Sequence, residues 1–254
     1  MRSEERNTAG LSMLGRSITL LLAFRTGESM TLAQLCRASG IPKGTAHRLV
    51  GELVQWGLLE RSGPRLRLGI RLFELGQLVA QRNIVDVAAP YLSDLYQATA
   101  STVHLAVIDG IEGVYLQKFT RPDGPPVASR IGGRMPLHCT GVGKALLAFS
   151  PRSVTDAVID AGLIRLTSRT IVAPGILRQD LNRARARGFA VEREESSVGV
   201  ACVAVPILST SGHAVAAIST TGRPQRFSST ALTTATRMAA LGVSRALSAG
   251  PGSR

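Results

Sequence analysis

The amino-acid sequence predicts an α+β protein of two domains, in which a winged helix-turn-helix precedes a linker helix and a larger domain with an antiparallel sheet. Two short helical patterns joined by a glycine turn, and then a hairpin pattern, occupy residues 31–69. From Ser101 onward, runs with the apolar character of strands alternate with helical stretches. A chain of 254 residues can form two domains of ordinary size. We therefore expect domains at residues 1–69 and 84–254, joined by a linker helix at 70–83.

The first helix is expected over residues 12–25, after a polar segment at residues 1–11 that shows no regular pattern. Its apolar residues recur on one side at helical spacing: Leu14, Ile18, Leu21 and Leu22. We expect this side to support the two helices that follow.

The segment from Thr31 to Trp56 carries the signals of two helices joined by a tight turn. Thr31 and Gln34 form a capping-box pattern, in which each side chain satisfies a backbone amide at the helix start. Gly40 can adopt the positive φ that ends the first helix, and Pro42 is suited to open the second. Apolar residues of the second helix recur at three- and four-residue spacing and predict a buried stripe: Ala46, Leu49, Val50 and Leu53.

The opposite side of the second helix begins with short or cationic residues, as a helix that enters the DNA major groove requires. These residues are Lys43, Gly44, Thr45, His47 and Arg48. Arg48 is the best candidate for a bidentate guanine contact, and Gly44 would let the backbone approach the DNA. His47 is equally suited to contact DNA or to cover the helix surface.

Two short apolar-alternating runs on either side of Ser62-Gly63-Pro64 predict a β-hairpin after this helix. Its outward positions carry three arginines, which we expect to contact phosphate or the minor groove: Arg61, Arg65 and Arg67. A helix-turn-helix followed by such a hairpin is a winged helix. The alternative interpretation is a small helical subdomain with a solvated basic face.

The charge distribution favours a polyanionic partner. The formal net charge is +13 and the sequence pI about 11.2. Only three of the 30 basic residues are lysines, so codon bias contributes to the arginine content, and position is more informative than the total. Residues 37–71 contain seven basic and two acidic residues. Aromatic residues make up only 4% of the chain and are not interleaved with arginines, which favours double-stranded over single-stranded nucleic acid.

Several other classes of protein are disfavoured. The three cysteines, at positions 36, 139 and 202, do not form a disulfide framework or a zinc-finger pattern. Cys139, Cys202, His104 and Glu192 include no closely spaced ligand pair, so we expect no metal site. The N-terminus lacks a signal-peptide pattern, and no apolar run is long enough to span a bilayer. We expect a soluble cytoplasmic protein without a membrane partner.

The second half predicts an α+β domain with an antiparallel sheet. Helices are expected from residue 84, with a bend or a fresh start at Pro90, and over residues 151–162, 174–187 and 225–247. Residues 136–150 are expected to pass from an irregular loop into a short apolar helix. Strand-like runs are expected over residues 101–109, 113–119, 188–196, 200–208 and 214–220, of which the third is edge-like. A Pro/Gly-rich loop is expected over residues 122–136.

Enzyme motifs are absent or incomplete in this half. The Gly141–Lys144 segment lacks the glycine and the hydroxyl residue that a phosphate-binding loop requires, because His138 and Ala145 occupy those positions. His138 and Cys139 are adjacent in sequence, and no flanking motif supports a nucleophile and base. We expect no catalytic residue and no cofactor. A cysteine-dependent enzyme remains an alternative, as does an interaction module that binds no specific DNA and no ligand.

Two segments are similar to the hallmark segments of IclR-family bacterial transcriptional regulators: PLHCTGVGKALLA at residues 136–148 and EESSVGVACVAVPI at residues 194–207. TAHRL, LRLGIRLFELG, RARARGFAVEREE and AAISTTG also follow the order of that family. The resemblance implies a winged helix-turn-helix DNA-binding domain, a linker helix and a GAF-like effector-binding domain at residues 84–254. It also implies a homodimer or homotetramer that binds a palindromic operator in double-stranded DNA. The resemblance does not indicate whether the protein represses or activates transcription.

The resemblance further implies an effector pocket for a small-molecule effector such as an organic or aromatic acid. By the family's motifs, Gly141 and Val142 supply backbone amides to it, and four further residues line it: Glu192, Cys202, Ser219 and Thr221. The Thr140-Gly-Val-Gly segment entering a helix presents free N–H groups at a positive helix end, which suits a carboxylate. An acidic Glu192 facing a carboxylate requires a bridging water, a ligand hydroxyl or a proton on one of the two groups.

Overall fold

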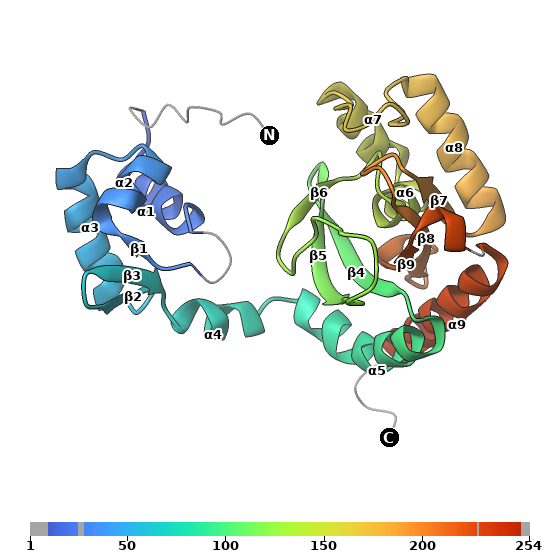
Figure 1. Cartoon of the computed structure of the whole chain (residues 1–254), viewed down its shortest axis with the longest axis horizontal. Helices are drawn as coiled ribbons and strands as arrows, with labels where there is room; N and C mark the ends of the chain where they lie inside the picture. The colour runs from blue at the N-terminus through green and yellow to red at the C-terminus, as the bar shows by residue number, and fades with distance from the viewer. Residues whose placement is uncertain (1–9, 25–27, 228, 250–254) are drawn as a thin grey trace. The chain divides into compact units, whose positions relative to one another are not determined.

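The computed structural model describes residues 10–24, 28–227 and 229–249, and the chain divides into two compact units between Arg82 and Asn83. The elements of the first unit are α1 (Met13–Leu22), β1 (Met30–Thr31), α2 (Leu32–Ser39), α3 (Lys43–Gln55), β2 (Leu59–Ser62), β3 (Arg65–Leu68) and α4 (Arg71–Gln77). Its three strands form an antiparallel sheet in the order β1-β3-β2 (Figure 1). Among the described helices, none is long and apolar enough to cross a membrane.

The predicted turn between α2 and α3 is confirmed in its main features. Thr31 and Gln34 form the capping box, and Gly40 ends α2 in the left-handed conformation with φ 70°. Pro42 precedes α3 as its N-cap, whereas the sequence had suggested the first helical position. Its ψ of 142° is extended, and its carbonyl accepts the first helical hydrogen bond, from the amide of Ala46 at 2.9 Å.

The core of the first unit contains the predicted stripe of α3, together with residues of α1, α2, the interhelical turn and the wing strands. Its members are Leu20, Phe24, Leu35, Ile41, Ala46, Leu49, Val50, Leu53, Leu59 and Leu66. The expected packing side of α1 is wrong for three of its four residues, because Leu14, Ile18 and Leu22 are exposed. Leu21 packs against the core as expected, and the fully buried Leu20 lies beside it. The run ITLLL is apolar on several sides of the helix, so periodicity alone did not select the side that meets α2 and α3.

The linker helix is shorter than expected. Helix α4 ends at Gln77, residues 78–80 are not helical, and α5 (Gln81–Thr99) begins immediately afterwards. Gly76 lowers the helix propensity of α4 by about 1 kcal/mol relative to alanine, and none of its residues is buried to compensate. No new helix begins at Pro90, which lies within α5 between the buried residues Ala88 and Leu92.

The second unit contains a six-stranded antiparallel sheet in the order β6-β5-β4-β9-β8-β7. Its strands are β4 (Thr102–Asp109), β5 (Glu112–Phe119), β6 (Arg134–Pro136), β7 (Ala190–Arg193), β8 (Ala201–Leu208) and β9 (Ala214–Gly222). Strand β7 lies at an edge, as predicted. The sequence did not reveal β6, because three residues within a Pro/Gly-rich segment carry no measurable period.

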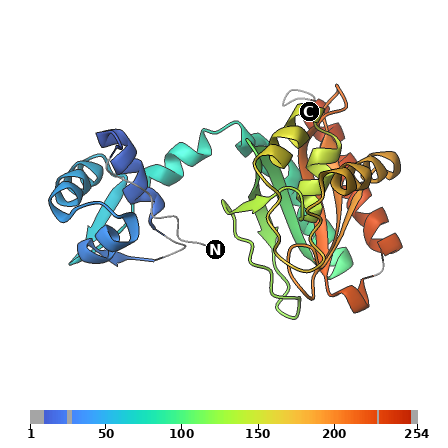
Figure 2. The same ribbon diagram turned by 90° about the horizontal axis from the view of Figure 1, so that it is seen from above.

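Helices cover both faces of this sheet (Figures 1 and 2). One face packs against α6 (Gly141–Ala148), α7 (Arg152–Asp160) and α8 (Pro174–Arg187), and the other against α5 and α9 (Ser229–Ser248). A short 3₁₀ helix, Pro224–Arg226, precedes α9. The α6 side of the central strands carries alanines, among them Ala106, Ala204 and Ala217, whereas the opposite side carries branched residues. The small side chains give α6 room to lie close to the sheet.

Candidate functional site

All six residues predicted to bind an effector line one cavity of about 180 Å³ on the side of the sheet that α6 covers. They are Gly141, Val142, Glu192, Cys202, Ser219 and Thr221. The strand register explains how residues so distant in sequence meet. Directly opposed residues of antiparallel strands share a face, and the register opposes Glu192 to Cys202 and Cys202 to Thr221. These three side chains therefore form one row across β7, β8 and β9, and Ser219 lies in the adjacent row.

The start of α6 supplies the helical part of the cavity wall. The Thr140 hydroxyl caps the helix by accepting a hydrogen bond from the Gly143 amide at 3.2 Å. The amides of Gly141 and Val142, which belong to the first helical turn, have no hydrogen-bond partner among the described residues. A Cβ at Gly141 would lie 2.5 Å from the Cys202 sulfur, so glycine permits this close approach of helix and sheet.

The cavity is also lined by residues that local sequence patterns did not indicate. Its further polar members include His104, Tyr115, Ser129, Thr140, Ser196 and Ser197. His104 lies opposite Ser219 in the register of β4 and β9, and its Nε2 is 2.8 Å from the Ser129 hydroxyl. Burial lowers the pKa of His104 to about 3, so this imidazole is neutral near pH 7. Strand pairing would have identified His104, but the pairing of β4 with β9 is not encoded in local sequence patterns.

Glu192 is almost completely buried at the edge of the cavity. Its Oε1 accepts hydrogen bonds from the amides of Glu195 at 2.6 Å and Ser196 at 3.1 Å. Burial raises the pKa of Glu192 to about 7, although these two amides favour the charged form. Burial also raises the pKa of the neighbouring Cys202 thiol to about 12, which leaves it protonated.

Lys144, on the same helix as Gly141 and Val142, is fully buried and bonded to two carboxylates. Its Nζ lies 2.9 Å from Oδ2 of Asp180 and 2.6 Å from Oε1 of Glu195. Burial raises the pKa of the Glu195 carboxyl. For Asp180, burial would also raise the pKa, but the ammonium of Lys144 and the guanidinium of Arg183 together outweigh it, and the pKa is lowered. The lysine that resembles a phosphate-loop lysine in sequence is thus an internal counterion joining α6, α8 and the segment after β7.

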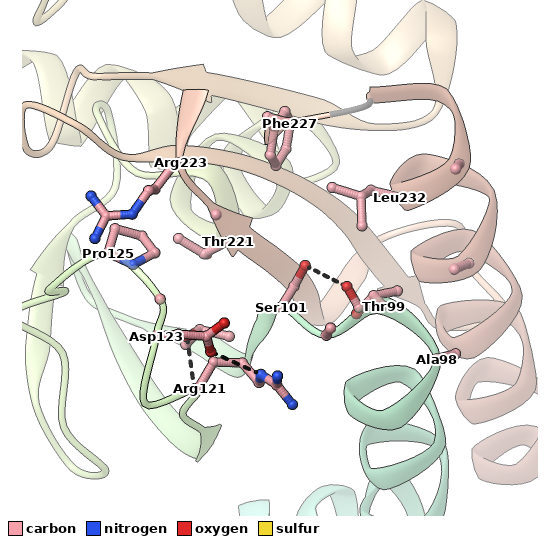
Figure 3. Close-up of a pocket in the computed structure, with 16 residues that line it drawn as sticks. Ala98, Thr99, Ser101, Arg121, Asp123, Pro125, Thr221, Arg223, Phe227 and Leu232 are labelled. Carbon is pink, nitrogen blue, oxygen red and sulfur yellow. Dashed lines mark hydrogen bonds and ion pairs between the residues drawn. The ribbon is translucent and has the colours of Figure 1, made fainter. Parts of the chain in front are cut away.

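A second hollow, of about 460 Å³, lies at the ends of β4 and β9 (Figure 3). Of the six predicted effector residues, only Thr221 lines it. Figure 3 shows Arg121 beside Asp123 and Ser101 bonded to Thr99. The Arg121 Nε atom lies 3.3 Å from Oδ1 of Asp123, and the Ser101 hydroxyl donates to the carbonyl of Thr99. These polar groups are partnered locally and do not form a nucleophile and base.

Cys139 and His138 do not form a catalytic pair. The Nε2 atom of His138 lies 3.0 Å from the carbonyl oxygen of Ile164, and no hydrogen bond to Cys139 occurs among the described residues. Burial raises the pKa of the Cys139 thiol to about 12, far from the reactive thiolate range. Among all the residues that the structure describes, no group of three His, Cys, Asp or Glu side chains is placed to hold a metal ion.

The predicted DNA-contacting side of α3 lies on the surface of the first unit. Lys43, Gly44, His47 and Arg48 are exposed and Thr45 is half-buried. Arg48 forms an ion pair with Glu52 one turn further along α3, and its side chain is still 58% exposed. The basic side of the helix is therefore accessible and opposite the buried stripe.

The three wing arginines are exposed but not equivalent. Arg61 lies opposite Leu66 in the hairpin register, so it is on the other face of the wing from Arg65 and Arg67. The prediction that all three arginines point outward from the same face is therefore wrong. Arg65 donates to the Ser29 hydroxyl at 2.6 Å and to the Ser29 carbonyl, and Arg67 lies 2.7 Å from Glu60. Arg61 has no hydrogen bond or ion pair with any described residue. The sequence does not separate them, because the pair Leu58-Leu59 is compatible with either alternation along β2 and only the register shows that Leu59 is the buried one.

Comparisons with known proteins agree with this architecture. Residues 13–63 match the IclR helix-turn-helix domain, and residues 76–249 match the bacterial transcriptional regulator IclR C-terminal domain. The chain is 32% identical to the HTH-type transcriptional regulator KipR of Bacillus subtilis, over 91% of this chain and 94% of that protein. It is also 32% identical to the transcriptional repressor IclR of Escherichia coli, over 85% and 81% of the two chains.

A solved structure of an IclR homolog from Microbacterium hydrocarbonoxydans, in complex with 4-hydroxybenzoate, is 30% identical. It superposes with a TM-score of 0.87 over 93% of this chain and 99% of that one. The helix-turn-helix with its wing and the effector-type domain thus occur together, in the same order, in regulators of known class. The chain belongs to the IclR family of bacterial transcriptional regulators, proteins that bind DNA through a helix-turn-helix domain.

Proposed function

We propose that this regulator inserts α3 into the major groove of its operator and that a small carboxylate, bound in the 180 Å³ cavity, modulates this binding. One observation supports the proposed effector site. Six residues from segments far apart in sequence line a single cavity, and two of them have helix amides without a hydrogen-bond partner among the described residues. Such amides at the positive end of a helix bind anionic oxygens.

Base recognition falls to the exposed side of α3. Lys43, Thr45, His47 and Arg48 reach the base edges, and Gly44 allows the backbone to come close to the duplex. Arg48 pairs with Glu52 in the free protein, but an exposed pair at this spacing contributes only about 0.3–0.5 kcal/mol. A bidentate guanine contact, worth about 1–3 kcal/mol, can therefore displace it.

Phosphate binding falls mainly to Arg61, the wing arginine with no partner among the described residues. Arg65 and Arg67 lie on the other wing face, where they add positive charge while bonded to Ser29 and Glu60. A dimer or tetramer would present two such units to the half-sites of a palindromic operator, because a two-fold protein matches a two-fold site.

The ligand class follows from the cavity. The volume suits a small organic or aromatic acid, and 4-hydroxybenzoate, the ligand of the Microbacterium homolog, is a first compound to test. The acid changes operator binding only if it binds one arrangement of the protein more tightly than another.

A two-step experiment tests the proposal on the full-length chain. Thermal shift with a panel of small acids and their neutral amides identifies ligands, and fluorescence anisotropy with DNA from upstream of the gene measures operator affinity with and without them. We expect stabilisation by acids and a change in operator affinity. Stabilisation by the neutral compounds alone would exclude the carboxylate site, and equal affinity for any duplex would exclude specific recognition.

A further inference from the structure

The balance of charge around the cavity is unusual for a site that binds an anion. Glu192 lines it, as do Gly141 and Val142, whose amides have no hydrogen-bond partner among the described residues. Gly141 and Glu192 flank the same Cys202 side chain: a Cβ at Gly141 would lie 2.5 Å from its sulfur, and Glu192 is its register partner. A carboxylate bound to these amides would therefore lie near the Glu192 carboxyl group.

In the described part of the chain, every cation that lines the cavity has a carboxylate partner, although Lys118, which lies opposite His104 outside the lining, has none. Lys144 is the nearest buried cation, and its ammonium already bonds to Asp180 and Glu195. Arg134 lines the cavity but pairs with Asp109 and Glu112, and Lys118 donates to the Ser129 carbonyl at 2.7 Å. The Glu195 carboxylate also faces Glu192 and raises its pKa, while the ammonium of Lys144 lowers it. The remaining titratable side chains near Glu192 are neutral near pH 7: Tyr115, Cys139, Cys202 and His104.

The geometry of Glu192 leaves one oxygen for the ligand. Its Oε1 accepts both backbone hydrogen bonds, from Glu195 and Ser196. Its Oε2 has no hydrogen-bond partner among the described residues. A protonated Oε2 can donate a hydrogen bond to a bound carboxylate, whereas an ionised one repels it.

We propose that Glu192 makes this cavity proton-linked, so that a small carboxylate binds together with one proton, which Glu192 carries on Oε2 and donates to the ligand. The proton comes from hydronium or a buffer acid, whose bond to it breaks as the O–H bond on Oε2 forms. That O–H group then donates a hydrogen bond to the ligand carboxylate and keeps its proton. This inference rests on the proposed carboxylate effector, and it adds that the effector binds only when Glu192 is protonated. Burial already places the pKa of Glu192 at about 7, and a second negative charge nearby raises it further.

Isothermal titration calorimetry of the full-length protein tests this inference, with benzoate and 4-hydroxybenzoate as probes. The heat of binding is compared in two buffers of different ionisation enthalpy, at about pH 6 and about pH 8. We expect uptake approaching one proton at the higher pH and little uptake at the lower pH. Affinity should fall by about tenfold per pH unit above pH 7, as linkage requires.

Glu192→Gln supplies the decisive variant, because its amide keeps the size, the acceptor for the two backbone N–H groups and a donor toward the ligand. We expect it to bind both acids without proton uptake and with an affinity independent of pH. The control is Asp160→Asn, an exposed carboxyl on α7, which should keep the wild-type proton uptake.

Two outcomes overturn the inference, and they differ in what they imply for the proposed carboxylate effector. If an acid binds the wild type at about pH 8 without proton uptake, the proton linkage is wrong and the carboxylate effector stands. If neither acid binds the wild type or Glu192→Gln at either pH, this inference and the proposed aromatic-acid site both fall. The wild-type measurement decides the matter even if the variant fails to fold.

Discussion

The ammonium of Lys144 lies 2.6 Å from the carboxylate of Glu195, and the backbone amide of Glu195 donates to Glu192 at the same distance. A buried ion pair on one side of Glu195 and a cavity carboxyl on the other are therefore linked through a single residue. The carbonyl of Glu195 also accepts a hydrogen bond from the Thr170 hydroxyl at 2.7 Å. The segment that follows β7 is thus held from three directions next to the proposed ligand.

Replacing Lys144 with methionine should destabilise the second unit strongly. The substitution keeps the volume of the side chain but removes the counterion of the buried Glu195 and leaves Asp180 with Arg183 alone. Breaking a buried ion pair in this way costs about 3–5 kcal/mol. Denaturant unfolding of the full-length protein measures the loss. Arg183→Met is the matched control, since its exposed pair with Asp180 should contribute less than about 1 kcal/mol. Equal stability of Lys144→Met and the wild type would show that the pair contributes nothing.

The free energy of unfolding should depend on pH through Glu192. Its folded pKa of about 7 lies above the ordinary value of 4.5, so the folded state holds a proton that the unfolded state releases. Relative to Glu192→Gln, the wild type should therefore lose about 3 kcal/mol as pH rises from about 4.5 to about 7, and nothing further above that. Denaturant unfolding of both proteins across this range measures the difference. A pH-independent difference would mean that Glu192 titrates normally.

His104 should produce the opposite dependence. Its folded pKa of about 3 lies below the ordinary 6.5, so the unfolded state takes up a proton that the folded state excludes. Relative to His104→Gln, the wild type should lose stability as pH falls below about 6.5 and should show no difference from proton linkage above it. The same unfolding series reports this change. Because the two residues act in opposite directions between about pH 4.5 and 6.5, the wild-type curve alone conceals both.

Gly141→Ala should disturb the cavity because of the contact with Cys202. The added methyl would lie 2.5 Å from the sulfur, and such overpacking costs about 1–3 kcal/mol. We expect lower stability and loss of the thermal shift produced by acids. Adding Cys202→Ala, which removes the sulfur, should restore much of the stability. If the double variant is no more stable than Gly141→Ala, the clash is not the cause.

Arg48→Ala and Arg61→Ala should weaken DNA binding in different ways. Loss of Arg48 should cost about 1–3 kcal/mol at the operator and relax base preference, because base contacts specify sequence. Loss of Arg61 should weaken binding to all duplexes and reduce the slope of log affinity against log salt by about one. Anisotropy titrations at several salt concentrations separate the two effects. Unchanged discrimination by Arg48→Ala would mean that α3 is oriented differently in the groove.

Much of the fold was predictable from local signals. The capping box at Thr31, the glycine at position 40 and the stripe from Ala46 to Leu53 each depend on residues within a few positions of one another. The same holds for the hairpin turn at Gly63, where φ is positive, and for most helices of the second unit. The packing side of α1 was predicted wrongly because its apolar pattern is ambiguous, and β6 was not predicted because it is too short to show a pattern.

The sequence by itself determined the element types, the winged helix, the family resemblance and the six residues that line one cavity. Only the tertiary structure decided which side of α1 is buried and that Ser29 holds Arg65. It alone also showed that Lys144 is an internal counterion and that His104 joins the cavity. The physical reason is sequence separation: Arg65 meets Ser29 across 36 positions and Lys144 meets Glu195 across 51, so these contacts depend on packing and strand register rather than on local periodicity.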